Sequence, residues 1–251
     1  QPEQVLKLGN LKKTLRSLAE NGPDEFYRGS IANELVTDLN EGGSRITLED
    51  LHNYIPLESE PLRGKHRGHD LYTPGVTSGG QRLNEALEYV EENLNYSDPF
   101  GANTYIAYAK GLNKAFKSHK EKLGRTINYG CTSHMSTVDS EGNMVSLTYT
   151  LLNRFGSKVV LPRTGVLMNN SVSYFDPRPG YPTSMAGGKR INSSNMCPTI
   201  CVKNGEAKFA VGASGANHIV PCTMELTAFL IDYGLSLEDA FNLPRIDVNE
   251  T

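Results

Sequence analysis

The order of the secondary-structure signals predicts an α+β fold, in which helices come first, paired antiparallel strands follow and helices return. The first half of the chain carries apolar residues at helical spacing, with charged residues between them. Beyond Gly130 the apolar pattern changes to a period of two, interrupted by glycine turns. Because the strands are grouped together and do not alternate with helices, this order argues against a βαβ repeat.

The bulk composition excludes several classes of function. The chain has 251 residues, 38% of them hydrophobic, a net charge of −3 and a pI near 6.1. Proteins that bind nucleic acid usually present a basic face, so we expect no nucleic-acid partner. No segment reaches the roughly eighteen consecutive apolar residues of a membrane-spanning helix, so we expect no membrane span.

The four cysteines show neither a disulfide framework nor a metal-site pattern. Cys197 and Cys201 are spaced C-x3-C, but no histidine cluster completes a zinc site, so we expect buried thiols, no metal and no cofactor. The N-terminus shows no signal peptide, and the chain does not begin with methionine, which suits a processed or truncated chain. The compartment stays open, with a cytoplasmic location favoured over an exported one.

Apolar spacing and turn residues predict the individual elements. In the first half we expect a helix over 8–18 and another from Phe26 that ends at Gly42-Gly43. We also expect a short helix from the capping box Thr47-Leu48-Glu49-Asp50, an extended segment over 66–74, a helix after the loop 77–80, and a helix that carries Tyr105 to Phe116 and ends before Gly124. In the second half we expect hairpins over 136–150 and 199–211, strands over 159–161 and 166–168, a long loop over 176–190, helices over 219–233 and from Ser236, and the start of a strand over 244–248.

Taken one by one, the residues that can carry chemistry give weak signals. The glycine-rich turn 212–216 precedes a helix, where free N–H groups can hold an oxyanion, but a tight strand-to-helix turn explains it as well. His134 and His218 are each either a general base or a satisfied polar group. Asp139 and Glu141 fall in a hairpin turn, so we expect them to be solvated turn residues and not an acid/base pair.

The segment Gly130-Cys131-Thr132-Ser133-His134 contains three possible nucleophiles. A threonine hydroxyl needs an activating base, and a free α-amino group on the same residue supplies one once the preceding peptide bond is cut. Cys131 is the chemically obvious alternative, but nothing nearby in the sequence indicates a stabilised thiolate.

The segment that begins at Thr132 resembles the γ-glutamyltransferases from their self-cleavage point onward. The resemblance covers nearly the whole chain in the right order. Its motifs are Gly22 to Gly29, Ile46 to Leu51, Thr77 to Gly80, Thr132 to Asp139, Ser146 to Thr150, Phe155 to Ser157, Gly165 to Asn170, Pro198 to Ile200, Asp232 to Leu235 and Glu238 to Ala240.

This resemblance implies a four-layer αββα sandwich of the N-terminal-nucleophile hydrolase type, here as a partial chain. Residues 1–131 would be the C-terminal part of a large-subunit region and residues 132–251 the N-terminal part of a small-subunit region, together forming one αββα domain. The precursor would cut itself between Cys131 and Thr132, and the two subunits of that precursor would stay partners.

The function implied is cleavage of a small-molecule amide by Thr132, with transfer of the acyl group, γ-glutamyl in the family, to water or an amine acceptor. Two alternatives stay open: an acylase-like amidohydrolase with a non-glutamyl substrate, and a catalytically silent homologue. Matched by position, Thr150 would orient the nucleophile, Gly215 and Ala216 would form the oxyanion hole, and Ser194 and its neighbour Asn195 would line the substrate pocket.

Several positions depart from the family pattern. The asparagine expected two residues after Thr150 is Leu152, so Asn153 would have to replace it. The acidic residue that grips the substrate's α-amino group falls at Tyr174, and a glutamine near it falls at Ser171. Asp176 is the nearest acid in the sequence. The departures place classical γ-glutamyl recognition in doubt and leave the chemistry intact.

We predict that the complete protein separates into two chains at the bond between Cys131 and Thr132. N-terminal sequencing of the smaller chain should read Thr-Ser-His-Met. Thr132→Ala removes the hydroxyl that performs the cleavage and should leave a single chain, whereas Cys131→Ala should leave the mature enzyme largely active. A Thr132→Ala protein that still splits at this bond would exclude Thr132 as the agent of cleavage.

Overall fold

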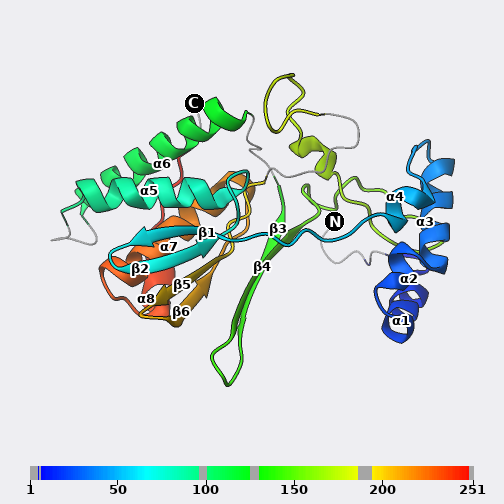
Figure 1. Ribbon diagram of the computed structural model, residues 1–251, viewed down its shortest axis with the longest axis horizontal. Helices are drawn as coiled ribbons and strands as arrows, with labels where there is room; N and C mark the ends of the chain where they lie inside the picture. The colour runs from blue at the N-terminus through cyan, green and yellow to red at the C-terminus, as the bar shows by residue number, and fades with distance from the viewer. Residues whose placement is uncertain (1–4, 6, 96–100, 125–129, 186–193, 249–251) are drawn as a thin grey trace. The chain divides into compact units, whose positions relative to one another are not determined.

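The computed structural model describes residue 5 and residues 7–95, 101–124, 130–185 and 194–248. The chain divides into two compact units (Figure 1). The first consists of Gln1–Glu58 and Phe155–Asn170, and the second of Ser59–Arg154 and Ser171–Thr251. The predicted subunit boundary after Cys131 therefore lies inside the second unit, and the division of the domain at that bond stays a prediction.

The first unit is a small helical assembly of α1 (Leu11–Asn21), α2 (Asp24–Tyr27), α3 (Ser30–Glu41) and α4 (Leu48–His52). Its core contains Ile31, Leu35 and Leu161. Arg163 pairs with Asp38 and, at 2.7 Å, with Glu41, so the segment that follows residue 155 is fastened to α3. The capping box that opens α4 is present in both directions, as the sequence predicts.

Two sequence predictions in this unit are wrong. The helix expected from Phe26 is broken at Gly29, which is extended, because the Glu25 carboxylate occupies the space beside it and accepts a 3.1 Å bond from the N–H of Ser30. Its expected end at Gly42 is confirmed. The strands expected over 159–161 and 166–168 form only one isolated bridge, between Val160 and Leu167.

The second unit is built on a four-stranded antiparallel sheet of order β1-β2-β5-β6. Its strands are β1 (Leu62–His66), β2 (His69–Thr73), β5 (Thr199–Lys203) and β6 (Glu206–Val211). The predicted hairpin over 199–211 is confirmed, with Asn204 and Gly205 at positive φ in its turn. β1 was not predicted, because Leu62-Arg63-Gly64-Lys65 lacks an apolar alternation.

Helices cover one face of this sheet. They are α5 (Gly79–Asn93), α6 (Ala102–Leu123), α7 (Ile219–Asp232) and α8 (Leu237–Asn242), and Figure 1 shows α5 and α6 running side by side. Leu71 and Cys201 of the sheet share a core with buried residues of α5, α6 and α7, among them Leu83, Tyr108 and Phe229. The helices predicted around these apolar residues are confirmed: α6 ends just before Gly124 as expected, and α7, expected over 219–233, ends one residue earlier.

A separate hairpin lies against the opposite face of the sheet. It consists of β3 (Thr132–Val138) and β4 (Met144–Thr150). The hydroxyls of Ser136 and Ser146 each donate a 3.2 Å bond to a carbonyl of β6. Helices, four-stranded sheet and hairpin thus form three successive layers in the order α, β, β. The outward face of the hairpin exposes large apolar side chains, among them Met135, Leu147 and Tyr149.

The strand expected over 244–248 does not form. The N–H of Ile246 instead donates a 2.9 Å bond to the carboxylate of Glu225, which is fully buried on α7. Burial raises the pKa of Glu225 to about 8, since a charged carboxylate is poorly solvated there. Of the predicted loop over 176–190, residues 186–190 lie outside the described residues. No described helix is both long and apolar enough to cross a membrane.

We predict that Glu225→Gln increases stability at alkaline pH relative to the native chain. The folded state keeps the proton of Glu225 up to about pH 8, whereas the unfolded state loses it near 4.5. Stability of the native chain therefore falls as pH rises between these values, by at most about 1.4 kcal/mol per pH unit, and the variant escapes this loss. Urea unfolding at pH 5 and pH 9 measures the free energy of unfolding of both proteins.

Glu238→Gln, at an exposed position of α8, is the matched control and should show no such pH dependence. A constant difference in unfolding free energy between native chain and Glu225→Gln at both pH values would contradict a buried, proton-retaining Glu225.

Candidate active site

The three groups around the predicted cleavage point are held together by the hydroxyl of Thr150. Thr132 and Thr150 face each other at the paired ends of β3 and β4. Thr150 Oγ1 donates a 2.9 Å bond to the carbonyl oxygen of Cys131, the carbonyl of the bond expected to be cut. The same oxygen accepts a 2.8 Å bond from the N–H of Leu152 and a 3.4 Å bond from the Thr132 hydroxyl.

These contacts leave the Thr150 hydroxyl no other orientation. A hydroxyl has one proton and two lone pairs. The proton goes to the Cys131 carbonyl, since a carbonyl cannot donate, and the two lone pairs receive Leu152 and Thr132. The Cys131 carbonyl is polarised as a result, and the Thr132 oxygen keeps its lone pairs available for attack.

Leu152 bends the chain directly after β4. Its φ is +72°, a left-handed conformation that is uncommon for a residue other than glycine, and its side chain is buried. In this conformation its N–H reaches Thr150, and its carbonyl accepts a hydrogen bond from the N–H of Cys131. Strain of this kind persists where the surroundings impose it, often at functional sites.

The glycine-rich turn lies beside this junction. Gly215 has φ +111° and ψ +39°, and Ala216, at φ +55°, begins the short 3-10 helix Ala216–His218. A Cβ placed on Gly130 would lie 3.5 Å from the Cβ of Ala216, so the turn borders the residues before Thr132. Within the described residues no hydrogen bond leaves the N–H of Gly215 or Ala216. This arrangement suits an oxyanion hole.

The segment that carries Ser194 and Asn195 is fixed by the loop before α5. The N–H of Ser194 donates to the carbonyl of Thr77 at 3.1 Å, and its hydroxyl to that of Ser78 at 3.2 Å. A Cβ on Gly79 would come within 2.8 Å of the Asn195 carbonyl oxygen, so the close approach requires glycine here. Asn195 is buried and donates a 2.8 Å bond to Asn217, the residue after Ala216.

Two departures from the family pattern are in contact. Tyr174, at the end of the 3-10 helix Ser171–Tyr174, packs against Leu152 in a small buried cluster. Burial raises the pKa of the Tyr174 phenol, which is therefore neutral at working pH. Asn153 is half-buried next to Leu152. Asp176 is buried and bonds to Arg178 at 2.7 Å, so its charge already has a protein partner.

The other ionisable candidates have structural partners. His134 bonds through its two ring nitrogens to the hydroxyls of Thr148 and Ser136, at 2.8 Å and 3.1 Å, and burial lowers its pKa. His218 pairs with Asp247 at 2.7 Å. Asp139 accepts bonds from the N–H groups of its own turn, as the sequence predicts.

All four cysteines are free, and Cys197 and Cys201 are buried. Burial raises the pKa of Cys197 to about 12 and that of Cys201 to about 11, so both are inert thiols, in line with the sequence prediction. No group of three potential metal ligands occurs among the described residues.

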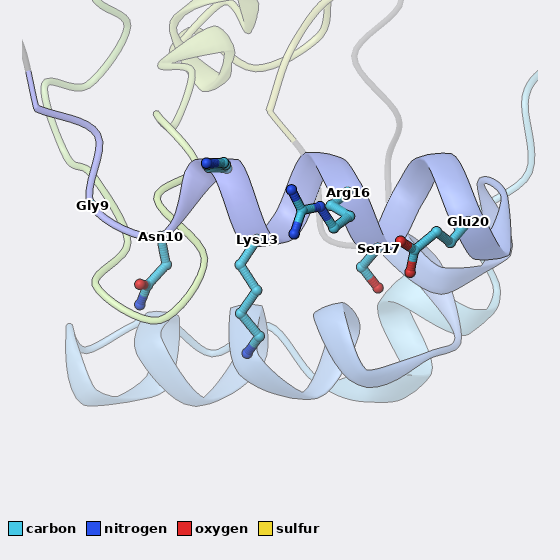
Figure 2. A pocket seen from close by; sticks show the side chains of 7 residues that line it. Gly9, Asn10, Lys13, Arg16, Ser17 and Glu20 are labelled. Atoms are coloured by element: carbon cyan, nitrogen blue, oxygen red, sulfur yellow. The ribbon is translucent and has the colours of Figure 1, made fainter.

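Each of the two units contains a cavity. One, of about 640 Å³, opens between the four-stranded sheet and the hairpin, where Tyr72, Ile200 and Ser146 meet the Thr77–Ser78 loop that holds Ser194. The other, of about 440 Å³, belongs to the first unit and follows α1 (Figure 2). Its lining residues are polar, with Lys13, Arg16 and Glu20 along α1. Neither cavity is lined by any of the predicted site residues.

Sequence reasoning missed two residues of this region. Arg82, on α5, is fully buried and bonds to both Asn195 and the Ser194 carbonyl. Asn217, which follows Ala216 in the glycine-rich turn, is buried and accepts the bond from Asn195. An arginine on an amphipathic helix and an asparagine after a glycine turn are ordinary surface residues by pattern, so the sequence carries no signal for either.

The layers of helices, four-stranded sheet and hairpin, with Thr132 at the start of β3, agree with the N-terminal-nucleophile hydrolase fold that the sequence predicts. Consistent with this, 94% of the chain superposes on the crystal structure of a cephalosporin acylase from Bacillus halodurans, with a TM-score of 0.76 and 26% identity, covering 49% of that chain. The family model for gamma-glutamyltranspeptidase matches residues 1–125 and 102–250. The chain belongs to the gamma-glutamyltranspeptidase family.

Its relatives in this family carry two kinds of name. The chain is 33% identical to a glutathione hydrolase proenzyme of Escherichia coli strain K12, over 96% of its own length and 50% of the relative's. It is 30% identical to an acylase ACY 1 proenzyme of Pseudomonas sp. strain SE83, over 98% of its length and 51% of the relative's. The chain thus spans about half the length of these curated relatives.

We predict that Thr150→Val slows separation of the precursor into two chains by about a hundredfold, because it removes the proton that Thr150 donates to the Cys131 carbonyl. Thr150→Ser keeps that proton and should cleave within a few-fold of the native rate. Gel analysis of the precursor over time after synthesis gives both rates. Equal cleavage by Thr150→Val and Thr150→Ser would show that the hydroxyl does not assist.

Proposed function

We propose that this chain is the central part of a self-processing enzyme that cleaves an amide through Thr132 and transfers the acyl group to water or an amine. The observation that carries the proposal is the hydrogen bond from Thr150 to the Cys131 carbonyl, with the Thr132 hydroxyl bound to the same oxygen. Family membership supports it, since the relatives named above are proenzymes of hydrolases and acylases.

In the first step the Thr132 oxygen attacks the carbonyl carbon of Cys131. The C–N bond breaks, its nitrogen takes the hydroxyl proton, and an ester joins Cys131 to Thr132. Water then hydrolyses the ester, leaving a carboxylate on Cys131 and a free hydroxyl and α-amine on Thr132. The Thr150 hydroxyl stabilises the negative charge that develops on the Cys131 carbonyl oxygen.

In the mature enzyme the α-amine of Thr132 removes the proton from its own hydroxyl, which attacks the substrate carbonyl. The N–H groups of Gly215 and Ala216 receive the oxyanion. The leaving amine takes the proton, and an acyl ester remains on Thr132 until water or a second amine resolves it. A silent homologue would not need to keep this set together, so we favour an active enzyme.

The contact between Tyr174 and Leu152 favours an acylase-like specificity over γ-glutamyl recognition. A γ-glutamyl substrate brings a charged α-amino group, which needs a carboxylate or several acceptors once it loses water. Tyr174 offers a neutral phenol and Leu152 an alkyl group, while Asp176 is occupied by Arg178. These side chains suit an apolar or aromatic acyl group instead.

We predict poor turnover of γ-glutamyl-p-nitroanilide relative to neutral acyl anilides, and a gain of about tenfold or more in kcat/KM for the γ-glutamyl compound on Tyr174→Asp. A new carboxylate pairs with the ammonium group, and tenfold corresponds to about 1.4 kcal/mol. Tyr174→Phe is the control: it keeps the ring and should not change the preference. Efficient native turnover of the γ-glutamyl compound, not improved by Tyr174→Asp, would contradict the assignment.

A further inference from the structure

Arg82 is a fully buried arginine that donates hydrogen bonds to the Ser194–Asn195 segment. Its guanidinium lies 5.2 Å from the centre of the Phe116 ring, and it donates to the side chain of Asn195 at 2.8 Å and to the carbonyl of Ser194 at 2.9 Å. Burying a guanidinium is expensive unless its hydrogen bonds are used. The positive charge of Arg82 also acts on His119. Burial is the main cause that lowers the pKa of His119 to about 3, and the charge of Arg82 lowers it further.

The direction of these bonds is fixed by chemistry. Arginine has only donors, so the oxygen of the Asn195 amide must face Arg82 and its nitrogen must face away. That nitrogen donates a 2.8 Å bond to the side-chain oxygen of Asn217. Asn195 and Asn217 are each 3% exposed, so the chain Arg82–Asn195–Asn217 runs through the interior, where hydrogen bonds are stronger than in water.

This chain ends at the oxyanion turn. Asn217 follows Ala216 directly and lies in the same 3-10 turn, whose first two residues, Gly215 and Ala216, have positive φ. No side-chain hydrogen bond caps the start of this turn at Gly215, and at its end His218 pairs with Asp247. The bond from Asn195 therefore supplies a side-chain anchor next to the two N–H groups.

We propose that Arg82 and Asn217 are positioning residues, which hold the Gly215–Ala216 turn in register with the Ser194–Asn195 segment by way of the Asn195 amide. The inference rests on the proposed function of that turn. Asn195 connects the two residues, because its amide oxygen accepts a bond from Arg82 and its amide nitrogen donates one to Asn217. Oxyanion donors act only at the right distance, and a displacement of about 1 Å costs about a hundredfold in rate.

The test uses the complete, self-cleaved protein and compares Asn217→Ala, Arg82→Lys and the double variant. Single-turnover acylation is measured per titrated active site, together with the substrate Kd. We expect Asn217→Ala to slow acylation by about 10- to 100-fold with Kd within about threefold, since the turn acts on the transition state and not on bound substrate. Arg82→Lys keeps the positive charge but loses the two guanidinium nitrogens that donate separately to Asn195 and Ser194, and it should slow acylation to a similar extent.

The double variant should be no slower than the slower single variant, because both changes break one chain of bonds. Thr223→Val is the matched control: it removes a buried hydroxyl of α7 that bonds only within its helix, and should acylate at the native rate despite some loss of stability. If Arg82→Lys does not fold, the acylation rate of Asn217→Ala is compared with that of Thr223→Val alone, and this comparison tests the proposal.

An Asn217→Ala variant that acylates at the native rate, or no more slowly than Thr223→Val, would overturn the proposal. So would a double variant whose loss of rate is the product of the two single losses. A native protein that forms no acyl-enzyme with any amide would instead overturn the proposed function, and the positioning role with it.

Discussion

The single proton of the Thr150 hydroxyl is the constraint on which the candidate site depends. It is committed to the Cys131 carbonyl, and the two lone pairs accept from Leu152 and Thr132. The paired ends of β3 and β4 bring these groups together, and the left-handed conformation of Leu152 turns its N–H back toward Thr150. One hydroxyl therefore links the Cys131 carbonyl, the Thr132 hydroxyl and the bend at Leu152.

The residues proposed for chemistry and those proposed for recognition differ in how well they match the family. At the proposed oxyanion turn, Ala216 stands where the family resemblance predicts glycine, and it keeps the backbone N–H that the proposed role requires. Ala216 adopts φ +55°, which glycine would adopt without strain, so the surroundings must impose it. The departures that alter chemical character, Leu152 and Tyr174, pack against each other in a small buried cluster. We therefore propose that specificity diverges in this chain while the chemistry is retained.

The sequence predicts what local interactions determine. The capping box at Thr47 and the Asn204-Gly205 hairpin form as expected, since their partners are a few residues away. Elements that depend on distant partners are not predictable in this way. The segment 244–248 fails to form a strand because Glu225 captures the N–H of Ile246, and Arg82 owes its burial to partners more than a hundred residues later in the chain. The site residues themselves came from the family resemblance.

The most direct test of the account is to locate the acyl group during turnover. The complete protein is mixed with an excess of a neutral acyl amide, quenched in acid and digested, and the masses of its peptides are measured by mass spectrometry. The account predicts that the acyl mass lies on a peptide that begins with Thr132, attached to that residue. An acyl group on Cys131, or on any peptide in which Cys131 and Thr132 are still joined, would contradict it.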